Sequence, residues 1–206
     1  MVARVLVIGG YGNFGSYISR SLAGDANIRL LIGGRSIDKA LQFLTTLEVI
    51  NAAEAHEIDI AGDVGAALAR IRPDIVIHTT GPFQSQDHRV ARACIAQGCH
   101  YLDLADARDF VATIGTLDAE ARAKGVLVVS GASSVPCLTA GVIDDYLPRF
   151  SRLDSVDYGI SAALQELEFW RKRCVRTLEF THWIWVVVTL LPSRERKKRT
   201  PKTRRT

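Results

Sequence analysis

The chain has 206 residues, of which 48% are hydrophobic, and a formal net charge of +4. This length and composition suffice for one sizeable core with a small appendage. Eight of the Lys and Arg residues fall between Arg194 and Arg205, so the rest of the chain is mildly acidic. That body has no basic patch suited to nucleic acid, and a polyanion or membrane tether would depend on the tail alone.

The cysteines and the first residues further narrow the classes of protein to which the chain can belong. The four cysteines lack the CxxC spacing of zinc or redox sites and are few for a disulfide framework, which predicts reduced thiols and no metal site. Met1 to Arg4 run directly into an apolar segment with no signal-peptide pattern, so we expect a cytoplasmic protein.

The segment from Val5 to Gly15 predicts a buried strand, a glycine turn and an amphipathic helix. Glycines of the GxGxxG pattern allow a tight turn, close approach of main chain to a pyrophosphate, and close packing of the helix on the strand. Phe14, Tyr17, Ile18 and Leu22 would form the apolar face of the helix, with Gly24 as its C-cap. The pattern therefore predicts a dinucleotide site that includes Gly10, Tyr11, Gly12, Asn13, Phe14 and Gly15.

A second strand, Ile28 to Ile32, ends in Gly33-Gly34-Arg35-Ser36. Sites for NAD usually carry an Asp or Glu here, whereas an arginine accommodates the 2′-phosphate of NADP. We therefore expect NADP rather than NAD, with Arg35 and Ser36 at the phosphate. The alternative is that Arg35 is a solvated side chain and Ser36 only the N-cap of the next helix, which carries Ile37, Leu41, Leu44 and Leu47.

Strands and helices continue to alternate along the chain. Expected strands cover His56 to Ile60, Asp74 to Thr79, His100 to Leu104 and Val126 to Ser130. Expected helices cover Ala66 to Arg70, the segment around Val90 to Ile95 closed by Gly98, and one longer helix from Phe110 through Ala121 to Gly125. Six strands in this order predict an α/β fold, a doubly wound and mostly parallel Rossmann sheet.

Several polar or aromatic residues admit a structural interpretation from the residues alone. Pro82 can end a strand and Phe83 can be a core aromatic, while Asp103 can be a solvated acid or a cap for the helix near Ala107. His78 lies in an apolar strand and is expected to be a core histidine with its hydrogen bonds made, and His88 to lie on a solvated helix start.

Five segments together resemble the NADP-binding domain of the saccharopine dehydrogenase-like oxidoreductases. They are VLVIGGYGNFG, GGRS, HTTGPF, HYLDLAD and GASSVPCLTAGVIDDYL, and the resemblance runs from about Val2 to Ala162. It implies that Thr80, Gly81, Pro82 and Phe83 lie beside the nicotinamide end of the cofactor and Asp59 near the adenine. It also implies that Asp103, Ser133 and Ser134 face the cleft between cofactor and substrate.

The resemblance stops where family members continue into a large second domain. All sixteen glycines lie at or before Gly159, and all three tryptophans come after it. We expect residues 1–150 to be the NADP-binding Rossmann domain, 151–162 the start of a truncated second domain, and 163–206 an atypical extension, replaced or out of frame, with a basic, disordered tail. The apolar run Trp183 to Leu191 is shorter than the ~20 residues of a transmembrane helix.

Three functions remain open from the sequence. The family implies an NADP-dependent oxidoreductase that moves hydride between the nicotinamide and an imine, amine or carbonyl substrate, the cofactor providing the chemistry. A non-catalytic NADP-binding module and a tether that acts through the basic tail are the alternatives. The expected partners are the dinucleotide and a small substrate of unknown identity; a homo-oligomer is left open, and the sequence names no catalytic residue.

Overall fold

The computed structural model describes residues 2–133, 137 and 139–152. Residues up to Cys137 form one compact unit, and a second unit begins at Leu138. In the described part of the second unit, α7 (Thr139–Tyr146) is followed by a short 3-10 helix, η4 (Leu147–Arg149), and the Arg149 guanidinium lies 4.8 Å from the centre of the Tyr146 ring.

The apolar run near Trp183, the basic tail and Ser134 lie outside the described residues. The predicted domain boundaries at residues 150 and 162 therefore stay predictions. No helix in the described part of the chain combines the length and hydropathy that crossing a lipid bilayer requires.

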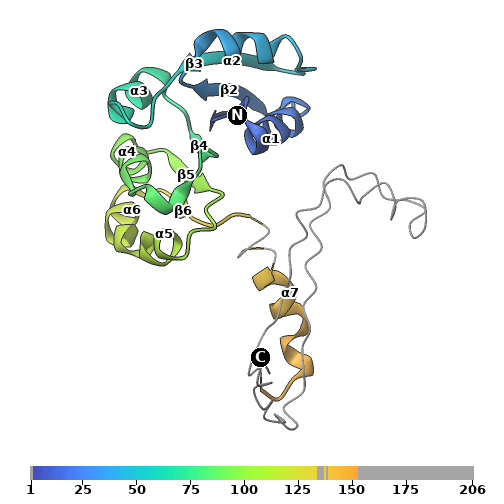
Figure 1. The fold of residues 1–206 in the computed structure, drawn as a ribbon, viewed down its shortest axis with the longest axis vertical. Coiled ribbons are helices and arrows are strands. Elements are labelled where there is room, and N and C mark those ends of the chain that lie inside the picture. The colour runs from blue at the N-terminus through green and yellow to red at the C-terminus, as the bar shows by residue number, and fades with distance from the viewer. Residues whose placement is uncertain (1, 134–136, 138, 153–206) are drawn as a thin grey trace, which may run out of the picture. The chain divides into compact units, whose positions relative to one another are not determined.

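The first unit is built on six parallel strands in the order β3-β2-β1-β4-β5-β6 (Figure 1). This order confirms the predicted doubly wound Rossmann sheet. The strands are β1 (Ala3–Ile8), β2 (Ile28–Gly34), β3 (Ala52–Glu57), β4 (Ile75–His78), β5 (His100–Asp103) and β6 (Val128–Val129).

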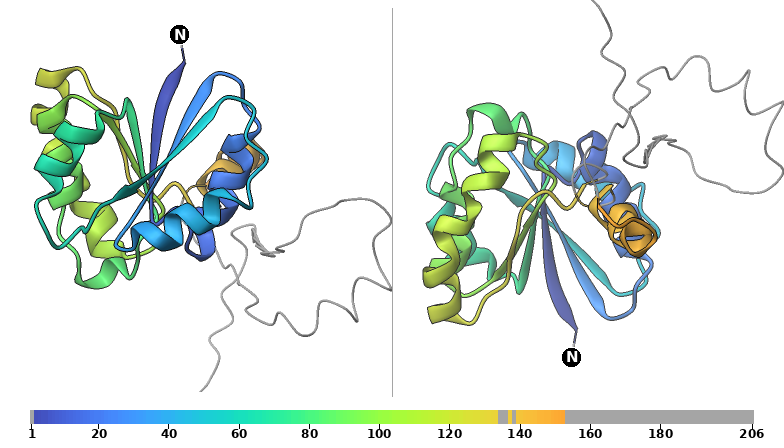
Figure 2. Two further views of the ribbon diagram at one scale, coloured as in Figure 1. Left: turned by 90° about the horizontal axis from the view of Figure 1, so that it is seen from above. Right: turned by 90° about the horizontal axis from the view of Figure 1, so that it is seen from below.

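Helices cover both faces of this sheet, as Figure 2 shows. One face carries α1 (Asn13–Ala23) and α2 (Ile37–Leu44). The other carries α3 (Val64–Ile71), α4 (Arg89–Gln97), α5 (Arg108–Thr113) and α6 (Asp118–Lys124), with the 3-10 helices η1 (Phe83–Ser85) and η2 (Ile114–Leu117) beside them. The direction of winding reverses between β1 and β4, so the crevice of an open α/β sheet lies at the carboxyl ends of these two strands.

The core divides into two layers because successive side chains of a strand point to opposite faces. On β1, Leu6 and Ile8 join the cluster that includes Leu68 of α3 and Cys94 of α4, whereas Val7 joins the cluster under α1 and α2. All four residues of β1 from Val5 to Ile8 are buried, as a parallel strand covered on both faces requires.

The helix ends follow the predicted capping residues. Ser36 accepts the main-chain N–H of Lys39 at 3.3 Å and is the N-cap of α2. Gly98 and Gly125 end α4 and α6 in the left-handed conformation, at φ of +73° and +65°. Gly24 is the C-cap of α1, although its conformation is right-handed.

The predicted apolar face of α1 is wrong in part. Phe14 and Tyr17 are 66% and 50% exposed, and the fully buried stripe consists of Gly15, Ser19 and Ala23. Small residues occupy this stripe because the helix approaches the turn after β1 closely. A Cβ at Gly15 would collide with the carbonyl group of Gly9.

Two other elements differ from the sequence prediction. The third strand is Ala52–Glu57 instead of His56 to Ile60, because its alanines pair with β2 in register and only Ile58, just beyond the strand, is fully buried. The single helix expected from Phe110 to Gly125 is interrupted by η2, which contains Gly115. A glycine inside a helix costs about 1 kcal/mol relative to alanine, which favours a break there.

Candidate functional site

The turn between β1 and α1 exposes main chain at the carboxyl edge of the sheet. Gly9 has a φ of +82°, a conformation that L side chains rarely adopt. A Cβ at Gly10 would lie 2.9 Å from the carbonyl oxygen of Val7, whereas a Cβ at Gly12 would meet only the Gly9 carbonyl at 3.1 Å. Gly10 is therefore required for the turn itself, and Gly12 leaves the outer side of the turn open.

The N-terminus of α1 lacks a capping side chain because its N-cap is Gly12. The main-chain N–H of Ser16 donates to Gly12, but no described residue accepts from the N–H groups of Asn13, Phe14 or Gly15. Unpaired donors at the positive end of a helix dipole form an anion-binding site. This cradle fits a phosphate group without any side chain.

Tyr11 connects this turn to the end of β2. Its hydroxyl accepts the main-chain N–H of Ser36 at 3.1 Å, and its ring lies over Gly34, where a Cβ would come within 2.5 Å of ring atoms. Arg35 lies between these contacts; its side chain is exposed and forms no ion pair with any residue in the described ranges. An exposed guanidinium beside the turn is suited to a second anionic group.

Asp59 lies two residues beyond β3, on the same edge of the sheet. It is exposed, and its carboxylate accepts the main-chain N–H of Ala61 at 3.0 Å. The preceding Ile58 donates its N–H to the carbonyl of Gly34, which holds this segment against the end of β2. Asp59 is thus on the side of the edge where Arg35 and Ser36 lie.

The segment from Thr79 to Phe83 forms the opposite wall of the crevice, next to the glycine turn. A Cβ placed on Gly9 would lie 2.7 Å from Cγ2 of Thr80, so the two segments are in contact. The peptide bond from Gly81 to Pro82 is cis, and both residues are exposed. Phe83 is buried on Phe110, with ring centres 5.3 Å apart, as its interpretation as a core aromatic predicts.

His78 is buried at the end of β4 with hydrogen bonds at both ring nitrogens, as predicted. Nδ1 lies 3.0 Å from the Tyr101 hydroxyl and Nε2 lies 2.6 Å from the Thr80 hydroxyl. Burial lowers the pKa of His78 to about 4, although the nearby charge of Asp103 acts in the opposite direction. The imidazole is therefore neutral at pH 7.

Asp103 is neither a solvated acid nor a helix cap, because it is fully buried at the end of β5 and the N-cap of α5 is Ala107. Its Oδ1 accepts from the N–H groups of Ala105 and Gly131 and from the hydroxyl of Ser130, each at 2.9 Å. Its Oδ2 is buried without a hydrogen-bond partner in the described part of the chain. Asp103 thus holds the loop after β6 against β5.

Ser133 is half-buried in this loop, two residues beyond Gly131, and its N–H donates to the carbonyl of that residue at 2.7 Å. The same loop is bonded to β5 through the N–H of Ala132, which donates to the main-chain carbonyl of Asp103. Ser133 is therefore in the same loop as Ser130 and Gly131, which donate hydrogen bonds to Asp103. Ser134 cannot be placed with them, because it lies outside the described ranges.

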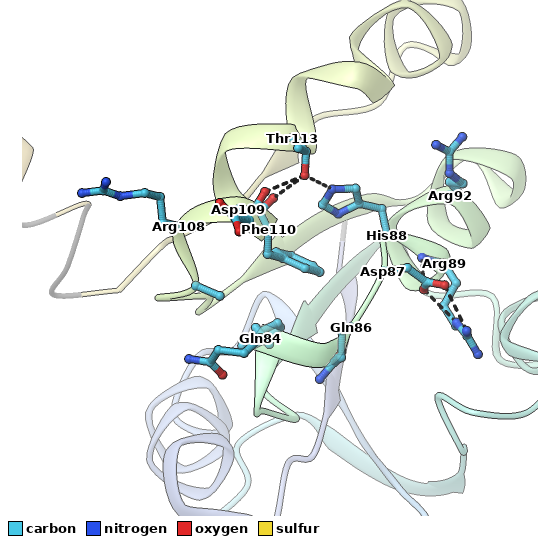
Figure 3. A pocket seen from close by; sticks show the side chains of 12 residues that line it. Gln84, Gln86, Asp87, His88, Arg89, Arg92, Arg108, Asp109, Phe110 and Thr113 are labelled. Carbon is cyan, nitrogen blue, oxygen red and sulfur yellow. Dashed lines mark hydrogen bonds and ion pairs between the residues drawn. The ribbon is translucent and has the colours of Figure 1, made fainter.

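A pocket of about 540 Å³ lies between the start of α4 and α5, next to Phe83 (Figure 3). Its ionic groups are largely paired: Arg89 binds Asp87, and Arg92 binds Glu120 outside the pocket. Neither Asp103 nor Ser133 lines it.

His88 also lines this pocket and is the N-cap of α4, so it lies at a helix start as the sequence predicted, but it is half-buried instead of solvated. Its Nε2 lies 2.9 Å from the Thr113 hydroxyl, its ring packs edge-on against Phe110, and burial lowers its pKa. Long-range contacts of this kind leave no local signal in the sequence.

Sequence reasoning missed two groups of this site. The sequence predicts Ser130 at the end of a strand but gives no hydrogen-bond partner for it. Tyr101 enters the prediction only as part of the segment HYLDLAD. The alternation of β5 could have indicated that Tyr101 and Asp103 point to the same face as His78 on the adjacent β4, because His78 pairs with Asp103 in register. The described residues contain no cluster of His, Cys, Asp and Glu able to hold a metal ion.

Comparison with known proteins supports the nucleotide-binding interpretation. The family model of the saccharopine dehydrogenase NADP binding domain matches residues 5–129, from the third residue of β1 to the end of β6. A comparison with curated protein sequences finds no match.

Solved structures show the same fold at low identity. Apo saccharopine dehydrogenase (L-Glu forming) from Saccharomyces cerevisiae is 18% identical, with a TM-score of 0.57 over 75% of this chain and 33% of its own. Biliverdin reductase from Synechocystis sp. PCC 6803, solved with biliverdin and NADP+, is 18% identical with a TM-score of 0.52 over 77% of this chain and 46% of its own. Amine dehydrogenase from Mycobacterium smegmatis is 16% identical with a TM-score of 0.53 over 75% of this chain and 46% of its own.

The chain therefore spans less than half the length of each of these structures. The family match covers most of the described first unit, and the cofactor of the matched domain is NADP. The chain belongs to the saccharopine dehydrogenase NADP-binding domain family.

Proposed function

We propose that NADP binds along the carboxyl edge of the sheet, across the reversal point between β1 and β4. Its pyrophosphate lies against the glycine turn and the start of α1, and its 2′-phosphate lies at Arg35 and Ser36. Asp59 lies near the adenine, and the nicotinamide lies beside the segment from Thr80 to Phe83. The residues assigned to the cofactor are Gly10, Tyr11, Gly12, Asn13, Phe14, Gly15, Arg35, Ser36, Asp59, Thr80, Gly81, Pro82 and Phe83.

The observation that carries this proposal is the unpaired N-terminus of α1. Three consecutive main-chain N–H groups have no acceptor among the described residues, and the N-cap is a glycine. An N-cap with a Ser, Thr, Asp or Asn side chain would satisfy one of these donors and stabilise the helix by roughly a few tenths of a kcal/mol relative to glycine. A glycine that forgoes this stabilisation leaves the donors for a ligand.

The preference for NADP rests on the residues at the end of β2. Gly34 and Arg35 stand where a carboxylate would bind a ribose 2′-hydroxyl and repel a 2′-phosphate. The Arg35 guanidinium is exposed and without an ion pair in the described ranges, so no internal interaction has to be broken before it binds a phosphate.

The reaction that fits this arrangement is hydride transfer with an imine, amine or carbonyl substrate. NADP supplies the hydride chemistry when it is bound, and the chain binds and orients it. Asp103, Ser133 and Ser134 are the proposed residues on the substrate side. A domain that binds NADP without turning over a substrate is the second candidate.

The test is a calorimetric titration of the full chain with NADPH and, separately, with NADH. We expect NADPH to bind more tightly than NADH, and Arg35→Ala to weaken NADPH binding by about ten- to a hundredfold while NADH binding is unchanged, since one charge-assisted contact is worth about 1.5–3 kcal/mol. Arg122→Ala, on α6, is the control because Arg122 is exposed and its ion pair within the described ranges is with Asp118.

Equal affinity for the two cofactors in the parent chain and in Arg35→Ala would contradict the assignment of the 2′-phosphate. Oxidation of NADPH that depends on an added ketone, or on a keto acid together with ammonia, would favour the enzyme. Binding of NADPH with no oxidation over a broad panel of such substrates would favour the non-catalytic module.

A further inference from the structure

A buried series of polar side chains leads from the nicotinamide side of the proposed site into the sheet. Thr80 contacts Nε2 of His78 at 2.6 Å, and Nδ1 of His78 contacts the Tyr101 hydroxyl at 3.0 Å. Tyr101 in turn lies near the carboxylate of Asp103, whose charge acts on both Tyr101 and His78. His78, Tyr101 and Asp103 are each at most 1% exposed, so no solvent competes with these contacts.

The protons in this series have one favoured arrangement. A carboxylate only accepts hydrogen bonds, and Oδ2 of Asp103 is buried with no hydrogen-bond partner in the described part of the chain, so its charge attracts the nearby hydroxyl proton of Tyr101. The O–H dipole of Tyr101 therefore points its proton toward Asp103, so its oxygen accepts from Nδ1–H of His78. Burial keeps the imidazole neutral, with one proton only, so Nε2 carries a lone pair and accepts the proton of Thr80.

This arrangement fixes what Thr80 offers to a ligand. Its single hydroxyl proton is directed inward at His78, and its oxygen keeps only lone pairs for the crevice. The methyl group of Thr80 faces the glycine turn, because a Cβ on Gly9 would meet its Cγ2 at 2.7 Å. The side chain is thus held on both sides, by His78 and by the turn, with an acceptor left over.

We propose that His78 and Tyr101 are positioning residues that hold the Thr80 hydroxyl as an acceptor for the carboxamide N–H of the nicotinamide. The inference rests on the proposed function, which puts the nicotinamide beside Thr80. To the proposed function it adds that the carboxamide is the group recognised, and that this group donates the hydrogen bond to Thr80. His78 thereby acts on the ligand from a position the ligand does not reach.

The probe is the 3-acetylpyridine analogue of NADP, in which a methyl group replaces the amide nitrogen and the carbonyl is kept. We expect the parent chain to bind NADP about three- to tenfold more tightly than the analogue, the value of one neutral hydrogen bond. In Thr80→Val we expect the ratio of the affinities for NADP and the analogue to fall to about one. Thr80→Ser keeps the hydroxyl, so we expect the parent ratio in that variant.

Tyr101→Phe distinguishes a positioning role from simple contact with Thr80. The substitution removes the acceptor of Nδ1–H, and the imidazole can then donate from Nε2 to Thr80, whose own proton turns outward. The ratio of the two affinities then falls to about one or below. We expect the same fall of the ratio in His78→Phe, which is the substitute variant if Tyr101→Phe does not fold.

The control is Thr113→Val, which removes the hydroxyl of the other His–Thr pair, between α4 and α5, and leaves the ratio unchanged. Binding of 2′,5′-ADP, which lacks the nicotinamide, reports the integrity of the remaining site and stays constant in every folded variant. If neither 2′,5′-ADP nor NADP binds the parent chain, the proposed function itself fails. If both bind but the ratio is the same in Tyr101→Phe and in His78→Phe as in the parent chain, only the positioning role is overturned.

Discussion

The hydroxyl of Tyr11 accepts a hydrogen bond from the main-chain N–H of Ser36 at 3.1 Å. This bond joins the turn after β1 to the N-cap residue of α2. The ring of Tyr11 also rests on Gly34. These two contacts set the separation between the N–H groups at the start of α1 and the guanidinium of Arg35. Tyr11 therefore links the proposed pyrophosphate site to the proposed 2′-phosphate site.

Replacing Tyr11 with Phe keeps the ring and removes the acceptor of the Ser36 N–H. We expect the free energy of unfolding to fall by about 1 kcal/mol, the usual value of one such hydrogen bond. We also expect NADPH binding to weaken about three- to tenfold and NADH binding to change less, as measured by calorimetry. Equal losses for the two cofactors would mean that Tyr11 acts at the pyrophosphate, which they share.

Gly34→Ala tests the contact from the other side. The added Cβ lies 2.5 Å from the Tyr11 ring, so the ring must move, and we expect a loss of about 1–3 kcal/mol in urea unfolding. Gly24→Ala is the control because its Cβ would meet nothing nearer than 3.8 Å, and a change below about 0.5 kcal/mol is expected.

A double-mutant cycle identifies the cause of the Gly34→Ala effect. In a Tyr11→Ala background the methyl group has no ring to displace, so Gly34→Ala should cost much less there. An unchanged cost would place the strain in the main chain of β2 instead of in the contact with Tyr11.

Local patterns predicted most of the fold because both faces of the sheet are buried. The last four residues of strand β1 form a continuous apolar run, and Gly98 and Gly125 end helices in a conformation that favours glycine. The edge strand β3 has no such run, since none of its residues is fully buried, and its position was therefore misplaced by four residues at its start. Burial, and not strand propensity, produced the signal.

Long-range contacts explain what could not be predicted at the site. The glycine turn is a local motif, and its exposed main chain follows from spacing. The contacts of Tyr11 with Ser36, of His78 with Tyr101, and of Asp103 with Ser130 join residues 23 to 27 positions apart. Their partners depend on the order of strands in the sheet, which no local pattern contains.

Asp103→Ala should be among the most destabilising single changes at this edge. It leaves the buried N–H groups of Ala105 and Gly131 and the hydroxyl of Ser130 without their acceptor. Each unsatisfied buried group costs about 1–3 kcal/mol, so a loss of at least about 3 kcal/mol in the free energy of unfolding is expected. Ser130→Ala removes one of the three contacts and should cost about 1 kcal/mol in the same urea titration. Similar values for the two variants would show that Oδ1 does not hold the loop.

Acid should destabilise the domain through His78. Its pKa is about 4 when folded, because of burial, against the ordinary 6.5 when unfolded, so between these values the unfolded chain binds more protons. The free energy of unfolding therefore falls as the pH is lowered from 7 to 4, by up to about 3 kcal/mol from this residue, and the effect is absent above pH 7.

His78→Gln isolates that contribution, because His56 and His88 also have pKa values lowered by burial and add to the total in both proteins. The substitution shifts the whole curve by a constant amount, so the readout is its slope with pH. We expect urea unfolding at several pH values to give a shallower dependence for His78→Gln below pH 6.5, and the same dependence as the parent chain above it. Parallel curves over the whole range would mean that the folded protein accommodates a charged imidazole between Thr80 and Tyr101, and the neutral tautomer that orients Thr80 would then lose its physical basis.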